Sequence, residues 1–382
     1  MLALRLARGT HPLVLTRRLL VAAAAAGVGF LLLCTLGYAV GHPDRSSASA
    51  LRLLWCALPL AATVQFAVAV ARTDPSTRPR PGLSAVGLGP ARLTAIAAAS
   101  TAVACTLGST VALLFYLHLR GDITGLPFDG AAAELLAADQ PVPLAAALTL
   151  LAVLPVVAAT AAGLALRPRT APAAPEGAEK TMPSGLPWGI ALVAIGLAIE
   201  TYAAQGDSKS GLPLPGGFDG NPAGVLAGWV LTAVGLAMAG PGLAFGCGRL
   251  LQAVRPGATR LLAGRVLMDE SRRIGRPLGV VSAVLSGLLA AAQLYESDGS
   301  DAFGPLTALG AALILACTTA SLLTAALESR QGRAHTTEAL LRIGAPPTVL
   351  RTAALLRAGA LFAVFAPLTW AVAEMAALPL NG

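Results

Sequence analysis

Nine long apolar runs dominate this sequence, and they limit what the chain can fold into. Each is close to the roughly 20 residues with which an α-helix crosses a hydrocarbon core of about 30 Å. A helix satisfies its backbone hydrogen bonds within its own segment, and the interior of a bilayer has no water to replace them. The runs are Leu19–Gly41, Leu51–Ala71, Leu93–Leu119, Pro143–Leu166, Trp188–Ala204, Ala223–Gly246, Leu278–Leu294, Pro305–Leu327 and Thr352–Ala376. We therefore predict an all-α polytopic integral membrane protein with about nine transmembrane helices.

Composition and charge placement agree with this fold class. Hydrophobic residues make up 55% of the 382 residues and charged residues only 12%, which excludes an ordinary soluble domain. Of the 27 lysines and arginines, 23 lie at the chain start or in alternate connections. Because basic loops stay on the cytoplasmic side, this pattern predicts a cytoplasmic N-terminus, a multi-pass protein of the plasma membrane and no nucleic-acid partner. The basic segments are Arg5–Arg18, Arg72–Arg92, Arg167–Lys180, Arg249–Arg276 and Arg330–Arg357.

A short motif recurs at the start of two apolar runs. Leu83, Val86, Gly87, Pro90 and Leu93 align, at a constant offset of 257 residues, with Leu340, Ile343, Gly344, Pro347 and Leu350. Glycine permits a φ angle that other residues resist, and proline suits the first turn of a helix, so each copy predicts a tight bend at the inner membrane face followed by a span. We interpret the copies as an internal repeat. Both begin on the cytoplasmic side, which makes the repeats parallel.

Basic, partly apolar stretches precede the first span of each copy. Arg5 and Arg8 lie in the first stretch, and Arg265, Arg272 and Arg273 lie in the second. These stretches predict helices at the inner membrane interface. The predicted division is a first repeat of four helices at 1–166, a cytoplasmic linker rich in proline and alanine at 167–186, two connecting helices at 187–258, and a second repeat of three helices at 259–382.

Residues suited to catalysis or ion transport are sparse. No phosphate-binding G-x-x-x-x-G-K-[S/T] loop is present, and the four histidines are scattered over both predicted membrane faces. The five cysteines fit small buried residues. Glu200 and Glu374 fall near the outer ends of their spans, where each is expected to reach water, whereas Gln65 and Gln293 are expected to hydrogen-bond between helices. We predict that the chain is not an enzyme and binds no metal.

The segment Ala339-Leu-Leu-Arg-Ile-Gly-Ala-Pro-Pro-Thr-Val-Leu-Arg351, which follows a charged run and leads into a span, resembles the coupling segment of the FtsX-like (MacB-type) permeases of ABC transporters. Gly82–Leu93 is a weaker match, with Ala85 in the position of the arginine. The stretch 262–273 is similar to the interfacial helix that precedes a repeat in that family. The chain departs from MacB-type members because its outer loops are too short for a large ectodomain.

The resemblance implies the transmembrane subunit of an ABC transporter. A separate cytoplasmic ABC ATPase, in two copies, would bind the ATP, and this chain would carry no cofactor. It would export, or act mechanically on, an amphipathic or lipid-like substrate. Two other functions stay open: a non-transporting membrane regulator driven by the same kind of ATPase, and an ion-coupled secondary transporter. The expected ATPase-coupling residues are Leu83, Val86, Gly87, Pro90, Arg92, Leu340, Arg342, Ile343, Gly344, Pro347 and Arg351.

Overall fold

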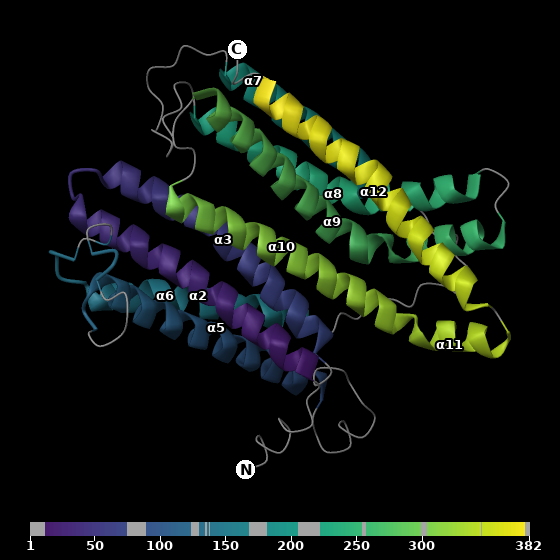
Figure 1. Cartoon of the computed structure of the whole chain (residues 1–382), viewed down its shortest axis with the longest axis horizontal. Helices are drawn as coiled ribbons and strands as arrows, with labels where there is room; N and C mark the ends of the chain where they lie inside the picture. Colours follow the sequence, from purple (N-terminus) through teal and green to yellow (C-terminus); the bar gives the residue numbers. More distant parts are fainter. Residues whose placement is uncertain are drawn as a thin grey trace. The chain divides into compact units, whose positions relative to one another are not determined.

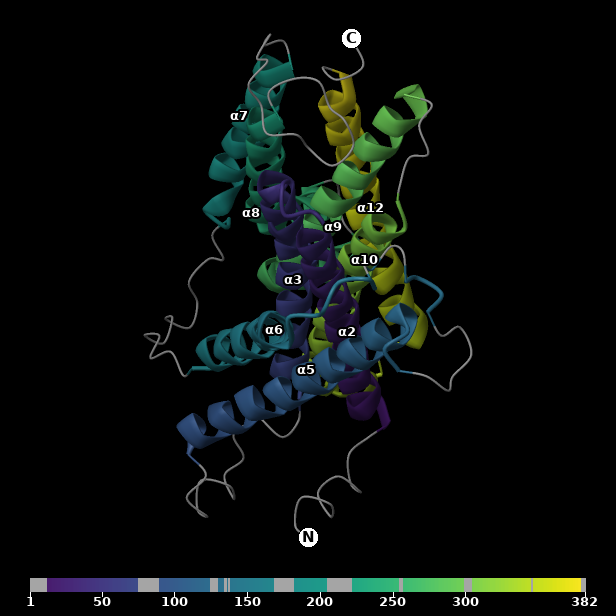
Figure 2. The same ribbon diagram turned by 90° about the vertical axis from the view of Figure 1, so that its left-hand side faces the viewer.

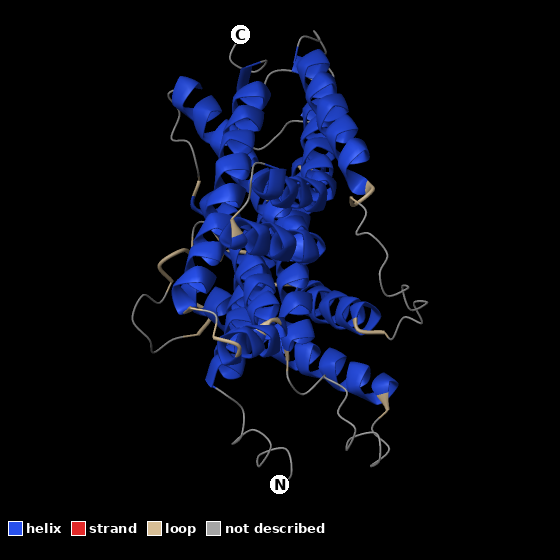
Figure 3. Ribbon diagram, turned by 90° about the vertical axis from the view of Figure 1, so that its right-hand side faces the viewer, coloured by secondary structure: helices blue, strands red, loops and turns tan. Residues whose placement is uncertain are grey.

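The structure is helical throughout the part of the chain that it describes. This computed structural model describes residues 12–74, 89–123, 130–133, 136, 138–167, 182–204, 222–253, 257–298, 304–344 and 346–378. Within those residues Figure 3 shows helices and connecting loops and no strand. The helices are α2 (Pro12–Gly41), α3 (Ser46–Thr73), α5 (Pro90–Arg120), α6 (Leu144–Ala165), α7 (Gly185–Ala204), α8 (Pro222–Ala253), α9 (Ala258–Asp298), α10 (Pro305–Gly332), α11 (Ala334–Arg342) and α12 (Pro347–Ala377).

Nine of the described helices are long and apolar enough to cross a membrane, and α11 is the short exception. They coincide with the nine apolar runs, which confirms the all-α polytopic class. Most helices extend beyond the apolar runs, and α9 is the clearest case, because it has 41 residues where the sequence predicts a span at Leu278–Leu294. Helix geometry continues into polar flanks whose side chains favour helices, so an apolar run marks the membrane-embedded part of a helix and not its ends.

The chain divides into two compact units. The first comprises Met1–Ala171 and Phe303–Cys317, and the second comprises Pro172–Ala302 and Thr318–Gly382. In the first unit α2 packs on α3, α5 and α6, and α5 packs on α6 (Figure 2). Gly108 of α5 allows a close approach, because a Cβ there would lie 2.7 Å from the Cβ of Ala25 and 3.0 Å from the backbone nitrogen of Ala26. Small residues at such crossings let membrane helices pack closely.

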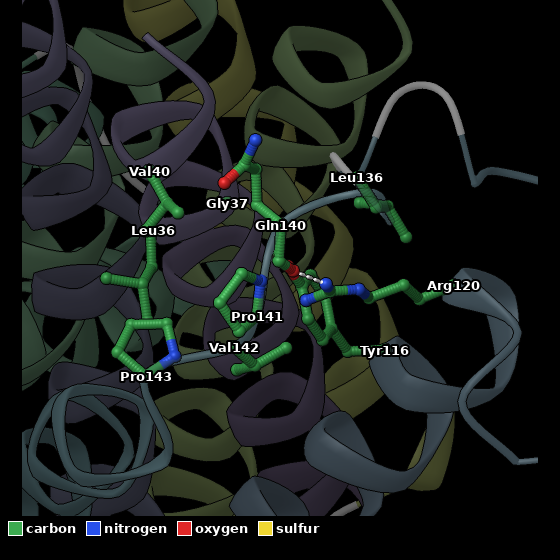
Figure 4. Close-up of a pocket in the computed structure, with 10 residues that line it drawn as sticks. All are labelled: Leu36, Gly37, Val40, Tyr116, Arg120, Leu136, Gln140, Pro141, Val142 and Pro143. Carbon is green, nitrogen blue, oxygen red and sulfur yellow. Dashed lines mark hydrogen bonds between the residues drawn. The ribbon is translucent and has the colours of Figure 1, made fainter. Parts of the chain in front are cut away.

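A buried arginine fixes the loop between α5 and α6 in the first unit. Arg120, the last residue of α5, has a side chain only 5% exposed and lies 3.3 Å from Asp122. Its guanidinium donates hydrogen bonds to the backbone oxygens of Ala138, at 3.4 Å, and of Gln140 (Figure 4). The adjoining cavity, beside Tyr116, has a volume of only about 10 Å³, which leaves room for no more than one water molecule. This cluster is therefore structural.

We expect Arg120→Met to loosen this loop. The methionine keeps much of the apolar stem but cannot donate, so two loop carbonyl groups lose a charged partner, at a cost of about 1–3 kcal/mol. Hydrogen exchange of residues 138–142 should accelerate. Arg45→Met is the matched control, because Arg45 is exposed and its side chain makes no cap hydrogen bond to α3. Equal exchange rates in the two variants would contradict the assignment.

Glycine contacts hold the second unit together. Gly228, Gly235 and Gly242 recur every seven residues along α8, which keeps them on one face over successive pairs of turns. On α7, Gly189 meets this face: a Cβ at Gly235 would lie 2.7 Å from the Gly189 carbonyl oxygen. Helices α7, α8, α9 and α12 are neighbours in this unit (Figure 1). The close backbone approach explains why glycine is frequent in these spans.

The predicted interfacial stretch of the second repeat is not a separate helix. Arg265, Arg272 and Arg273 lie on the N-terminal half of α9, which continues unbroken into the span. Pro277 lies inside α9, two residues after Gly275, which contacts Pro241 of α8, and Figure 1 shows α9 changing direction along its length. An internal proline removes one helix hydrogen bond and bends the helix. The three arginines are exposed, as expected for residues at a membrane surface.

Candidate functional site

The predicted second coupling segment forms a short helix between two spans. Helix α11 has nine residues and lies between α10 and α12. It ends where Gly344 adopts a φ of 93°, a left-handed conformation that glycine tolerates best. Pro347 then occupies the first turn of α12, where its missing N–H has no helical partner to lose. The bend predicted from glycine and proline is confirmed here.

The end of α11 presents apolar side chains to solvent. Ile343 is 85% exposed and Leu341 is 45% exposed, whereas Leu340 is half-buried. Arg342 is exposed beside them and pairs with Glu338 one turn earlier, at 2.6 Å. An exposed apolar tip of this kind, on a segment that charge places at the cytoplasmic surface, is typical of a contact for another protein. The sequence motif did not single out Leu341, because leucine at that position also fits a helix face that packs inward.

The other predicted coupling residues fall in two places. Arg351 is exposed in the second turn of α12. Pro90 begins α5 as Pro347 begins α12, and Arg92 is exposed in the first turn of α5. Leu83, Val86 and Gly87 lie outside the described residues, as do Arg5 and Arg8.

Glu270 of α9 pairs with an arginine just before α11 and with a second arginine inside α12. Its side chain is 10% exposed, and its Oε1 lies 2.7 Å from Nε of Arg333, the residue that precedes α11. Its Oε2 lies 3.7 Å from Nη1 of Arg357 on α12. Arg333 also donates to the hydroxyl of Ser329, at 3.3 Å. We call Glu270, Arg333, Arg357 and Ser329 the Glu270 cluster. It connects α9, the end of α10 and α12 around one carboxylate.

Sequence reasoning missed the Glu270 cluster. A glutamate among arginines in a basic stretch has the composition of a solvated helix face. The spacing of residues along the helix could have indicated its burial. Ala263, Leu267 and Glu270 are four and three residues apart, so Glu270 lies on the same face as the two apolar residues. An acidic residue on a buried face is expected to have a charged partner.

A second ion pair lies at the end of α3, in the polar run ahead of the first predicted coupling segment. Nη2 of Arg18, in α2, lies 2.5 Å from Oδ2 of Asp74, and Arg17 donates to the hydroxyl of Thr73 at 3.2 Å. Asp74 immediately follows α3. At the repeat offset of 257 residues Asp74 aligns with Gln331, two residues before Arg333. In each predicted repeat, therefore, a charged pair connects the residues that follow the second span to the first span, with the signs reversed.

Polar residues inside the spans serve helix packing. Gln293 of α9 donates to Glu374 of α12 at 2.9 Å, which confirms a hydrogen bond between helices at this glutamine. Glu200 was expected to reach water, and that prediction is wrong: it is 0% exposed and accepts a hydrogen bond from the indole of Trp229. The glycine contacts bring α8 so close to α7 that its backbone covers this acid. Gln65 is exposed on α3.

The placement of possible metal ligands and the comparisons with known proteins assign no function to the described residues. Among the described residues no group of three or more histidine, cysteine or acidic side chains is placed to hold a metal ion. The sequence matches no family model, no curated protein and no solved structure. The chain is a multi-pass helical membrane protein, and any finer function rests on its own residues.

Proposed function

We propose that this chain is the transmembrane subunit of an ABC transporter of the FtsX-like permease type. The observation that carries the proposal is the α11 segment: a short helix with exposed Ile343 and Leu341 at its tip, held between two spans at the predicted cytoplasmic surface. Exposed apolar side chains on a rigid helix can insert into a groove of a partner and provide most of the binding energy. The proposed partner is a cytoplasmic ABC ATPase.

The Glu270 cluster supports a mechanical role for this segment. When two ATPase subunits close on nucleotide, a docked α11 would be displaced along the membrane surface. Arg333 lies just before α11, and Arg357 lies ten residues after the start of α12. Both share one carboxylate on α9, so a displacement of α11 would also act on α9 and α12. Rigid helices transmit such displacement across the bilayer as shear or hinge motion.

The remaining parts of the proposal follow from this role. The permease lies in the plasma membrane, it performs no ATP hydrolysis itself, and its two coupling segments dock two ATPase copies. It moves, or exerts force on, an amphipathic or lipid-like substrate, because its described spans are almost wholly apolar and offer little to hydrate an ion.

The test is ATPase capture by wild-type protein and by an Ile343→Asp variant. Protein purified from native membranes in mild detergent should retain one kind of ATPase at two copies per permease, and Ile343→Asp should abolish retention. A buried aspartate lacks a partner in an apolar groove, so affinity should fall by roughly 10²-fold or more.

The matched control is Tyr202→Asp. Tyr202 lies near the end of α7 and is 83% exposed, close to the 85% of Ile343, but charge places it at the outer surface. This variant should retain the ATPase as well as wild type does. Loss of the ATPase in both variants would indicate general damage and argue against α11 as the docking site. Absence of any ATPase from the wild type would refute the proposed function itself.

A further inference from the structure

An apolar groove lies between the end of α8 and the first half of α12. It is an open groove and not an enclosed pocket, with a volume of about 420 Å³. Leu251 of α8 forms one wall, and the other wall is a single stripe along α12. That stripe consists of Thr352, Leu355, Leu356, Gly359, Ala360 and Ala363.

The groove exists because α12 packs mainly along its second half. From Phe365 onward α12 buries residues at helical spacing, ending at Ala376 and Ala377, while Leu355 in its first half is 72% exposed. Gly359 adds room, since a Cβ built there would meet no atom within 4 Å. A groove of this size inside a hydrocarbon layer is occupied by another molecule, because the side chains of an empty groove would lack dispersion contacts on one side.

The length of the groove fits one leaflet. Thr352 and Ala363 are eleven residues apart, which corresponds to about 16 Å along a helix. Half of a bilayer core is about 15 Å thick. Because charge places the start of α12 at the cytoplasmic face, the groove extends from that surface to the middle of the membrane.

The cytoplasmic end of the groove is positively charged. Arg351 is exposed and lies one helical turn before Leu355, so both share a face of α12. Thr352 lies at the same end, but its hydroxyl donates to the backbone oxygen of Thr348 at 2.7 Å, so Arg351 alone supplies the headgroup contact proposed here. An arginine guanidinium binds phosphate oxygens in bidentate fashion, and basic residues at this level attract anionic headgroups.

We propose that this groove is a binding site for one anionic phospholipid of the cytoplasmic leaflet. An acyl chain occupies the stripe from Leu355 to Ala363, and Arg351 binds the phosphate of the headgroup. A lipid fits this position better than a protein partner does, because the groove opens within the hydrocarbon layer and has the length of one leaflet. The site shares Arg351 with the predicted coupling residues, but lipid binding there requires no ATPase.

The test is native mass spectrometry of protein purified in mild detergent containing equal amounts of phosphatidylglycerol and phosphatidylcholine. Wild type should carry one phosphatidylglycerol. Gly359→Leu should reduce this occupancy about tenfold, the effect expected when a side chain displaces roughly two methylene contacts. Arg351→Gln should keep a lipid but lose the preference for phosphatidylglycerol.

Gly287→Leu is the matched control. Gly287 lies on α9, and a Cβ there also meets no atom within 4 Å, so the same side chain is added outside the groove. Its lipid occupancy should equal that of wild type, and the melting temperatures of both leucine variants should rise or stay level, because leucine is a better helix former than glycine. The proposal is overturned if Gly359→Leu retains the lipid, if Arg351→Gln keeps the headgroup preference, or if wild type is a dimer that Gly359→Leu converts to monomers.

Discussion

Gly275→Ala should destabilise the contact between α8 and α9, although alanine is the better helix former. A Cβ at Gly275 would lie 2.5 Å from the Cα of Pro241 and 2.7 Å from the backbone oxygen of Gly240. These neighbours are backbone atoms of a proline-containing helix, so they cannot rotate away as a side chain would. The helices must separate, which typically costs about 1–3 kcal/mol and sometimes more.

Gly287→Ala is the control for this expectation, because it should change the melting temperature in the opposite direction or leave it unchanged. Both glycines lie on α9, but a Cβ at Gly287 meets open space. There alanine brings only its helix propensity, a gain of roughly 0.5–1 kcal/mol. The melting temperature in detergent should therefore fall for Gly275→Ala and rise or stay level for Gly287→Ala. A rise in both variants would show that α8 and α9 do not approach as closely as the structure has them.

The membrane class and the nine long apolar helices among the described residues could be predicted, because the length of an apolar run follows from the thickness of the bilayer core. A run such as Pro305–Leu327 is about as long as a helix must be to cross the hydrocarbon core. The ends of the helices could not be predicted in this way. Arg272 and Arg273 lie in the same helix as the span that follows, because helix formation does not depend on the polarity of an exposed face.

The bend after α11 could be predicted, whereas its attachment could not. Gly344 and Pro347 impose local backbone constraints, so their effect is readable in a short stretch of sequence. The ion pair between Glu270 and Arg333 joins residues 63 positions apart, and nothing local identifies the partner. The burial of Glu200 was missed for the same reason, because the glycines that cover it lie on another helix.

Glu270→Gln should weaken both the fold around α11 and the proposed coupling. Glutamine keeps the size of the side chain but leaves Arg333 and Arg357 without a counter-charge. Removing one partner of a buried ion pair costs about 3–5 kcal/mol, and the lower value is expected here because the Arg333 side chain is 27% exposed. If the ATPase is the partner, permease-stimulated ATP hydrolysis should fall about tenfold while the ATPase still binds through Ile343.

A double-mutant cycle separates the ion pair from general damage. Glu270→Gln, Arg333→Gln and the double variant should give melting shifts that do not add, with an interaction free energy of about 1–3 kcal/mol. Glu338→Gln is the matched control: Glu338 lies 2.6 Å from Arg342 in the same segment, but both side chains are more than half exposed, so its loss should leave the melting temperature unchanged. Additive shifts in the cycle would mean that Glu270 does not hold Arg333. A stable Glu270→Gln variant with full stimulated ATPase activity would remove the Glu270 cluster from the proposed coupling path.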